Sequence, residues 1–126
     1  IIFPRLSRAM AKNDASLLIN ITNDAWFGKT SGPYQHFSMT VFRAVENRRA
    51  LVRSANTGIS GFIDPAGRVL DSTPLLQDAA LARSIPLLKT KTVYTRIGDL
   101  FAQLCFVSAL IVGLLEIFKF ALKFRK

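Results

Sequence analysis

The residue types that support catalysis are few in this chain. It has one histidine, His36, one cysteine, Cys105, and eight acidic residues. His36 and Asp24 could combine with a serine into a nucleophilic triad, but no serine lies on the strand-to-helix turn that exposes such a nucleophile. One histidine and one remote cysteine also give no metal-ligand pair at helical spacing. The residues alone therefore contain no complete catalytic set, and we expect neither a metal nor another cofactor.

Cys105 is a poor candidate for the missing nucleophile. It lies in the middle of a long apolar segment, where a thiol is inert, and a lone cysteine cannot form a disulfide within the chain. We interpret Cys105 as a residue that only fills space.

The best place for a site is a loop in the first third of the chain. Residues 16–22 (SLLINIT) form a compact apolar run typical of a buried strand, and it leads into the turn Asn23-Asp24-Ala25-Trp26-Phe27-Gly28. In α/β sheets the loops that follow buried strands commonly carry function. We expect the site in this turn, which bears two large aromatic side chains.

The elements around this loop predict an α/β domain. Apolar residues recur at steps of three and four from Gly32-Pro33 to about Arg49, which indicates a helix, and residues 6–12 indicate the end of an earlier one. Asp64-Pro65-Ala66-Gly67 has the composition of a tight turn. Strands are predicted at residues 51–55, 58–63, 69–72 and 79–85. Strands that follow a strand and a helix in this order indicate a layered α/β fold.

The last long segment has the length and composition of a transmembrane helix. Residues 100–118 contain one charge, Glu116, no proline, and apolar residues on every side of the helix. Nineteen residues rise about 28 Å in a helix, close to the thickness of a bilayer core. A buried core helix is the alternative. Basic residues follow the segment, which favours a cytoplasmic C-terminus and places residues 1–98 on the other side of the membrane.

The net charge of +9 is spread along the chain, with 13 Lys and Arg against 6 Asp and Glu in residues 1–98. Such a charge suits a nucleic acid or the anionic head groups of a membrane, or serves solubility alone. The arginines at positions 43, 48, 49 and 53 alternate with apolar residues rather than with exposed aromatic ones. We interpret them as a solvated helix face with internal ion pairs, and we expect no nucleic-acid partner.

Three stretches together resemble a known family. LLINITNDAWFG (residues 17–28), GPYQHF (32–37) and RAVENRRALVRSANTGISGFIDPAGRV (43–69) resemble the second half of a nitrilase-superfamily domain. Together with YTRIGDLFAQLC (94–105), these motifs resemble the apolipoprotein N-acyltransferase family. The resemblance implies the second half of a nitrilase-like α-β-β-α sandwich followed by one C-terminal transmembrane helix.

The resemblance also implies an organisation into four parts. Residues 1–89 are expected to be the C-terminal part of the nitrilase-like domain, 90–99 a connector, 100–118 the transmembrane helix and 119–126 a basic cytoplasmic tail. The opening Ile1-Ile2-Phe3-Pro4 resembles the end of a buried strand whose beginning is missing. We therefore expect the chain to be part of a longer protein, and the isolated piece to be inactive and poorly folded.

Members of this family use a Glu, a Lys and a Cys to move an acyl chain from a phospholipid, through a cysteine thioester, to the amine of a diacylglyceryl-cysteine. The matching cysteine would lie three residues before Ile1, and the Glu and Lys further upstream. The resemblance therefore assigns no catalytic residue to this chain. It implies that Trp26 and Phe27 line the acyl-chain pocket, that Asn23 and Asp24 brace their loop, and that His36 forms hydrogen bonds near the site. Arg53 and Asn56 are expected to be internal scaffolding.

The implied partners are a phospholipid acyl donor, a diacylglyceryl apolipoprotein acceptor and the bilayer. The implied location is the inner membrane of a Gram-negative bacterium, with a periplasmic nitrilase-like domain and a monomeric protein. Two alternatives remain open: a carbon–nitrogen hydrolase that acts on an amide or nitrile, and a non-catalytic membrane-anchored relative that binds lipid. The apolar segment at residues 100–118 argues against the first alternative.

Overall fold

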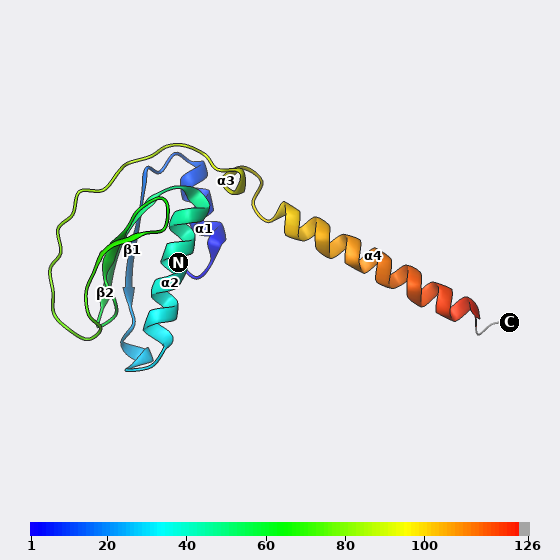
Figure 1. The fold of residues 1–126 in the computed structure, drawn as a ribbon, viewed down its shortest axis with the longest axis horizontal. Helices are drawn as coiled ribbons and strands as arrows, with labels where there is room; N and C mark the ends of the chain where they lie inside the picture. Colours follow the sequence, from blue (N-terminus) through cyan, green and yellow to red (C-terminus); the bar gives the residue numbers. More distant parts are fainter. Residues whose placement is uncertain (124–126) are drawn as a thin grey trace. The chain divides into compact units, whose positions relative to one another are not determined.

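A computed structural model describes the backbone of residues 1–123 and the side chains of residues 1–120. Its first ordered unit, Ile1–Arg96, is a mixed α/β structure, and the second, Ile97–Lys126, contains the long helix α4. The α/β fold class predicted from the sequence is thus confirmed (Figure 1).

One sheet of four strands in the order β1-β2-β3-β4 forms the framework of the first unit. β1 (Leu17–Asn23) pairs in parallel with β2 (Ala50–Asn56), and the antiparallel strands β3 (Gly61–Ile63) and β4 (Val69–Ser72) follow. The turn predicted at residues 64–67 joins β3 to β4, where the Gly67 amide donates to the Asp64 carbonyl at 2.9 Å. Because β1 and β2 are parallel, the loops that follow them leave from the same edge of the sheet.

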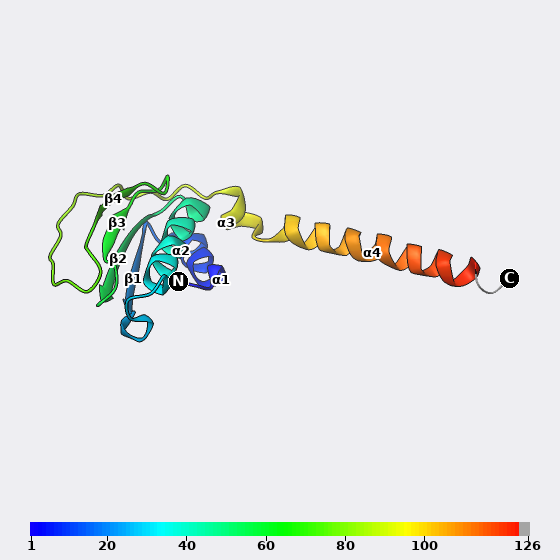
Figure 2. The same ribbon diagram turned by 60° about the horizontal axis from the view of Figure 1, so that its bottom comes forward.

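The long helix α2 (Gly32–Asn47) covers one face of this sheet, and α1 (Pro4–Lys12) packs against α2 (Figure 2). The core between sheet and helix consists of Leu18, Ala44, Leu51 and Ile63, all nearly inaccessible. α2 has a proline in its first turn and ends where Arg48 adopts a left-handed conformation with φ of 51°. The opposite face of the sheet is open at β1, where Ile19 and Ile21 are 65% and 81% exposed.

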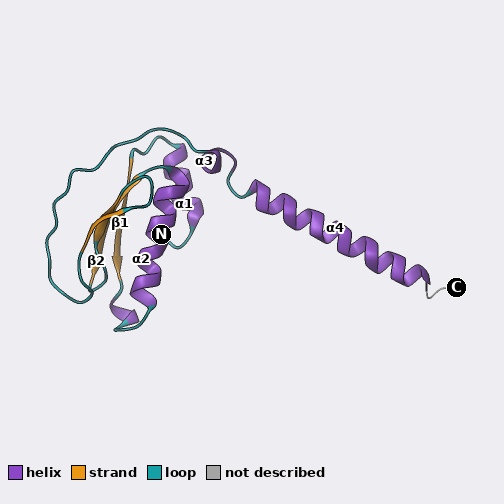
Figure 3. Cartoon of the chain, in the orientation of Figure 1, coloured by secondary structure: helices purple, strands orange, loops and turns teal. Residues whose placement is uncertain are grey.

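Two predicted strands are wrong. Residues 79–85 carry no regular structure and are mostly exposed, and residues 1–3 form no strand, since α1 begins at Pro4 (Figure 3). The 79–85 segment is apolar only in part, because Arg83 and Ser84 interrupt it, and it finds no neighbouring strand among the described residues with which to pair. The connector predicted at residues 90–99 contains a short helix, α3 (Val93–Ile97).

Arg43 and Arg49 are buried, so the interpretation of a solvated helix face is wrong for them, whereas Arg48 is exposed. Arg53 is buried, as expected of internal scaffolding. Arg49 donates to the carbonyls of Ala15, Asn47, Arg48 and Thr90, and its burial lowers its pKa. Arg43 forms the expected internal ion pair with Glu46 at 2.5 Å. These side chains satisfy backbone groups where chain segments meet, which explains why the domain holds them inside.

The helix α4 (Leu100–Lys123) is long and apolar enough to cross a membrane. Its stretch Leu100–Phe120 has a mean hydropathy of 2.2, and none of it is buried against other parts of the chain. Of the basic residues predicted to form a tail, Lys119 pairs with Glu116 at 2.7 Å, and Arg125 and Lys126 lie outside the described residues.

Candidate functional site

The aromatic loop follows directly from the carboxyl end of β1. Asn23 ends the strand, and its Oδ1 accepts a hydrogen bond of 3.0 Å from the amide of Ala25. This contact starts a short 3₁₀ turn, Ala25–Phe27, which stops at Gly28, whose φ of 57° favours glycine. The prediction that Asn23 braces the loop through a side-chain-to-backbone bond is therefore confirmed.

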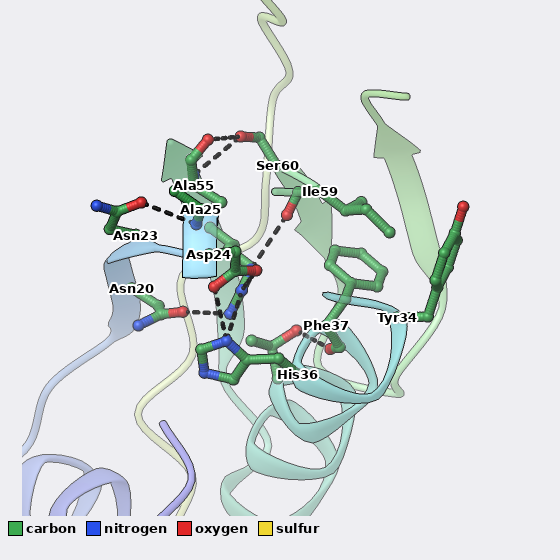
Figure 4. A network of polar contacts seen from close by, with 12 residues as sticks. Asn20, Asn23, Asp24, Ala25, Tyr34, His36, Phe37, Ala55, Ile59 and Ser60 are labelled. Carbon is green, nitrogen blue, oxygen red and sulfur yellow. Dashed lines mark hydrogen bonds and ion pairs between the residues drawn. The ribbon is translucent and has the colours of Figure 1, made fainter. Parts of the chain in front are cut away.

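Asp24 is the centre of a buried polar network that joins the sheet to α2 (Figure 4). Its Oδ1 lies 2.8 Å from Nδ1 of His36, and its Oδ2 accepts a hydrogen bond of 2.7 Å from Nη2 of Arg53. Both Asp24 and Arg53 are 2% exposed. The loop is thus attached to α2 through the imidazole and to β2 through the guanidinium.

The geometry determines which ring nitrogen of His36 carries a hydrogen. A carboxylate only accepts hydrogen bonds, so the 2.8 Å contact with Asp24 requires a hydrogen on Nδ1. Nη2 of Arg53 lies 3.1 Å from the same nitrogen, and two donors cannot bond to one another. In the neutral ring Nε2 is therefore the acceptor nitrogen. The carboxylate of Asp24 accepts a hydrogen bond from His36 and another from Arg53. His36 accordingly forms a hydrogen bond within the fold, as predicted.

All three nitrogens of the Arg53 guanidinium donate hydrogen bonds. Nε donates to the Ile59 carbonyl at 3.1 Å, and Nη1 donates to Oδ1 of Asn20 at 2.7 Å, in addition to the Asp24 bond. Burial lowers the pKa of Arg53, and the adjacent carboxylate of Asp24 opposes that shift. Because arginine remains charged even when buried, the pair is an ion pair held between β1, β2 and the loop after β2.

Two glycines make room for the network and for the aromatic side chains. A Cβ on Gly58 would overlap the carboxylate of Asp24, and a Cβ on Gly32 would lie 2.5 Å from the ring of Phe27. Larger residues at either position would displace the side chain they face. The loops after β1 and β2 are therefore fitted to one another at this edge of the sheet.

The two aromatic residues differ in exposure. Trp26 is 79% exposed, whereas Phe27 is half-buried against Gly32 and lies edge-on to His36 with ring centroids 5.9 Å apart. The rings of Trp26 and Phe27 lie 4.8 Å apart. An exposed tryptophan beside a half-buried phenylalanine forms an apolar surface on this loop.

A cavity of about 270 Å³ lies beside this surface, lined by Lys29, Thr30, Tyr34, Leu75 and Leu76. A polar cavity of about 250 Å³, which shares Leu76 with the first, is bordered by residues 54–58, Ser60, Thr73 and residues 76–79.

The structure brings Asn23, Phe27 and His36 together around Asp24, and Trp26 lies exposed on the same loop. Sequence reasoning missed that Asp24 bonds to two side chains rather than to the backbone, and it missed Asn20. Asn20 lies opposite Arg53 in the parallel pairing of β1 with β2, and only the strand register reveals that the two residues are neighbours. Cys105 lies on α4, outside this site, and the described residues hold no cluster suited to a metal ion.

Comparisons with known proteins identify the family. The model of the carbon–nitrogen hydrolase family matches residues 1–92. The chain therefore belongs to the carbon–nitrogen hydrolase family. A solved structure of an amidase of the nitrilase superfamily from Nesterenkonia is 28% identical, with a TM-score of 0.47 over 60% of this chain and 30% of that one.

Within this family the chain is similar to proteins named apolipoprotein N-acyltransferase. The one from Geobacter metallireducens is 54% identical over 90% of this chain and 22% of that protein. The one from Thermotoga maritima is 44% identical over 86% and 22%, respectively. The chain thus spans about a fifth of the length of these relatives, and the matched part extends beyond the family domain toward α4.

Proposed function

We propose that the protein containing this chain is an N-acyltransferase that moves a fatty acyl chain from a phospholipid to the N-terminal diacylglyceryl-cysteine amine of apolipoproteins. The combination that carries the proposal is the aromatic loop after β1, in which exposed Trp26 lies beside half-buried Phe27, together with the apolar helix α4, which is long enough to cross a membrane. A soluble amidase needs neither feature, because its substrates reach it through water. The names of the similar proteins support the same activity.

The proposed chemistry has two steps. A cysteine thiolate attacks the ester carbonyl of the phospholipid, and the lysophospholipid alcohol leaves with a proton as the thioester forms. The substrate amine then attacks the thioester, an amide forms as the carbon–sulfur bond breaks and the cysteine thiolate leaves, and a general base takes the proton that the nitrogen loses. The Cys, Glu and Lys for these steps are expected upstream of Ile1, so this chain contributes no catalytic residue and, as an isolated piece, is inactive.

This chain supplies the walls of the site in the proposal. Trp26 and Phe27 bind the acyl chain, Asn23 shapes their turn, and His36 with Asp24 and Arg53 holds the turn against α2 and β2. The network is buried, and its hydrogen bonds join the loop to α2 and β2, which makes it a support for the loop. Fixing the loop at this edge keeps the apolar surface in place for the substrate.

α4 anchors the domain in the proposal, with the nitrilase-like unit on the periplasmic side of a bacterial inner membrane and the protein monomeric. An anchored domain meets both lipid substrates at the bilayer surface.

The test is an assay of the complete protein in detergent with a phospholipid and a synthetic diacylglyceryl peptide that has a free N-terminal amine. Mass spectrometry should show the peptide gaining one acyl group on that amine, with one lysophospholipid formed for each peptide modified. Release of free fatty acid without peptide modification, or turnover of simple amides instead, would support the hydrolase alternative. No turnover of either substrate would support the non-catalytic alternative.

A further inference from the structure

The cavity of about 270 Å³ beside the aromatic loop combines one cation with an apolar wall. Lys29 and Thr30 belong to the loop before α2, Tyr34 comes from the first turn of α2, and Leu75 and Leu76 follow β4. The volume equals that of about nine water molecules in the liquid, which suits a polar group of about ten non-hydrogen atoms. The cavity is therefore large enough for the polar part of a lipid and too small for a complete lipid.

Hydrogen bonds hold the cavity beside the aromatic turn. Oγ1 of Thr30 donates to the Phe27 carbonyl at 2.8 Å and accepts from the Gly32 amide at 3.2 Å. On the leucine side, the Leu76 amide donates to the Thr57 carbonyl at 3.0 Å, and Leu76 has a left-handed φ of 59°, which is uncommon for leucine. Because both sides are bonded to the backbone, the cavity stays next to the aromatic side chains.

Two of the lining side chains carry hydrogen-bond donors that no other described residue uses. The ammonium of Lys29 and the hydroxyl of Tyr34 are both exposed, and neither has a hydrogen bond or an ion pair within the described part of the chain. No described acidic residue lines the cavity, since Asp24 lies in the buried network and Asp78 borders the polar cavity. An ammonium group only donates hydrogen bonds, so the cavity suits a ligand with anionic oxygens.

The two lipid substrates of the proposed reaction differ in charge at their polar ends. The phospholipid donor carries a phosphate, whereas the acceptor carries an N-terminal amine that is largely protonated in water. The ammonium of Lys29 attracts the first and repels the second. The acyl chains of the donor are joined to its phosphate through glycerol, so a phosphate in the cavity would place those chains beside the aromatic side chains.

From these observations we infer that the cavity binds the phosphate of the phospholipid donor, with Lys29 as counter-ion, Tyr34 as hydrogen-bond donor, and Leu75 and Leu76 against the glycerol. The inference rests on the proposed function and assigns the residues that recognise one of its substrates. It requires that the protein binds a lipid with a phosphate more tightly than the same lipid without one. Because the residues involved take no part in bond making, the preference can be measured as binding without turnover.

The test measures lipid binding to the complete protein in detergent by native mass spectrometry. The probe is a phosphatidylglycerol with ether-linked chains, which offers no ester carbonyl to a thiolate. The reference lipid is the same dialkylglycerol without its phosphate. Lys12→Gln is the matched control, because Lys12 is an exposed lysine in the last turn of α1 and lies outside the cavity.

Lys29→Gln should weaken binding of the ether phospholipid about fivefold, and Tyr34→Phe should weaken it about threefold, because each removes one polar contact with the phosphate. Binding of the dialkylglycerol should change in neither variant. Lys12→Gln should bind both lipids as the unmodified protein does. Since Lys29 and Tyr34 are exposed, both variants should keep the melting temperature of the unmodified protein.

A water-soluble head group distinguishes a lipid site from a site for free phosphate. Glycerophosphoglycerol carries the same phosphodiester without chains, so it loses the apolar contacts and should displace the ether phospholipid only at concentrations at least about tenfold higher. Displacement at equal concentrations would show a site for soluble phosphodiesters and would overturn the assignment to a lipid.

Three further results would overturn the inference. Unchanged binding of the ether phospholipid by Lys29→Gln would show that Lys29 is not its counter-ion. An equal loss in Lys12→Gln would show a general attraction of the basic protein for anionic lipid. An equal loss for the dialkylglycerol would show that the substitutions change the shape of the cavity. The proposed function is tested separately, because a protein that binds the phosphate through Lys29 and acylates no peptide would refute the activity and keep the site.

Discussion

Asp24 is the residue on which the local architecture of the site depends most. It is buried with Arg53, and it also accepts the hydrogen bond from His36. Removal of one partner from a buried ion pair leaves the other charge without compensation, which costs far more than the pair contributes. The loop after β1 therefore depends on a charge rather than on apolar packing.

Asp24→Asn is expected to lower the free energy of unfolding by about 3–5 kcal/mol, because the charge of Arg53 stays buried without a carboxylate. Urea unfolding of the complete protein in detergent, followed by limited proteolysis of the domain, measures the effect. Asp78→Asn is the matched control, since Asp78 is exposed, and it should change stability by less than about 0.5 kcal/mol. Equal stability of the two variants would contradict the role given to Asp24.

Asp64 makes a pH-dependent contribution to the β3–β4 turn. Its pKa is lowered: burial opposes ionisation, but hydrogen bonds from the Arg68 amide, the Arg68 guanidinium and the Ala66 amide outweigh it. A carboxylate with a depressed folded-state pKa stabilises the fold above its unfolded pKa, near 3.8, and loses this contribution as the pH falls further.

Asp64→Asn should therefore be less stable than the unmodified protein near neutral pH, and the difference should shrink as the pH falls below about 4. Melting temperatures of both proteins across this range provide the measurement. Asp78→Asn again controls for general charge effects. A difference that stays constant, or grows, in acid would show that the carboxylate of Asp64 is not stabilised in the fold.

At the scale of elements, the strong periodic patterns predicted the structure well. The helix from Gly32 and the strand run at 16–22 appear within one or two residues of their expected bounds, because apolar spacing and the proline in the first turn act locally. The segment 79–85 failed because a strand needs a neighbour, and nothing in its own residues reveals whether one exists.

The same limit applies to the site. The hydrogen bond from the Ala25 amide to the Asn23 side chain was predictable, because the two residues are only two positions apart in the sequence. The bonds from Asp24 to His36 and Arg53 join positions 12 and 29 residues apart, and they depend on the parallel register of β1 with β2. Long-range contacts of this kind follow from the fold and not from local spacing, so they became visible only in the structure.

At the scale of the whole molecule, the uncovered helix α4 decides how the protein is extracted from cells. Its apolar stretch Leu100–Phe120 has no covering partner among the described residues. Exposure of that much apolar surface to water is strongly unfavourable, so the helix should remain in lipid. The complete protein should therefore stay in the membrane pellet after washes with high salt and alkaline carbonate, and it should dissolve only with detergent. Release by salt alone would rule out a membrane-spanning α4.

In the proposed function, a domain anchored in lipid by α4 presents Trp26 to a lipid substrate. Because Trp26 is 79% exposed, its side chain contributes little to folding, and any effect of its removal on the reaction reflects substrate binding.

The most direct measurement is the rate of phospholipid-dependent peptide acylation by the complete protein carrying Trp26→Ala, with Trp26→Phe as the conservative variant. We predict a fall in kcat/KM of about tenfold or more for Trp26→Ala, equivalent to about 1.4 kcal/mol of lost transition-state binding, with substantial recovery in Trp26→Phe and an unchanged melting temperature. A wild-type rate for Trp26→Ala, or a loss of rate that only follows a loss of stability, would contradict the claim that this loop receives the acyl chain.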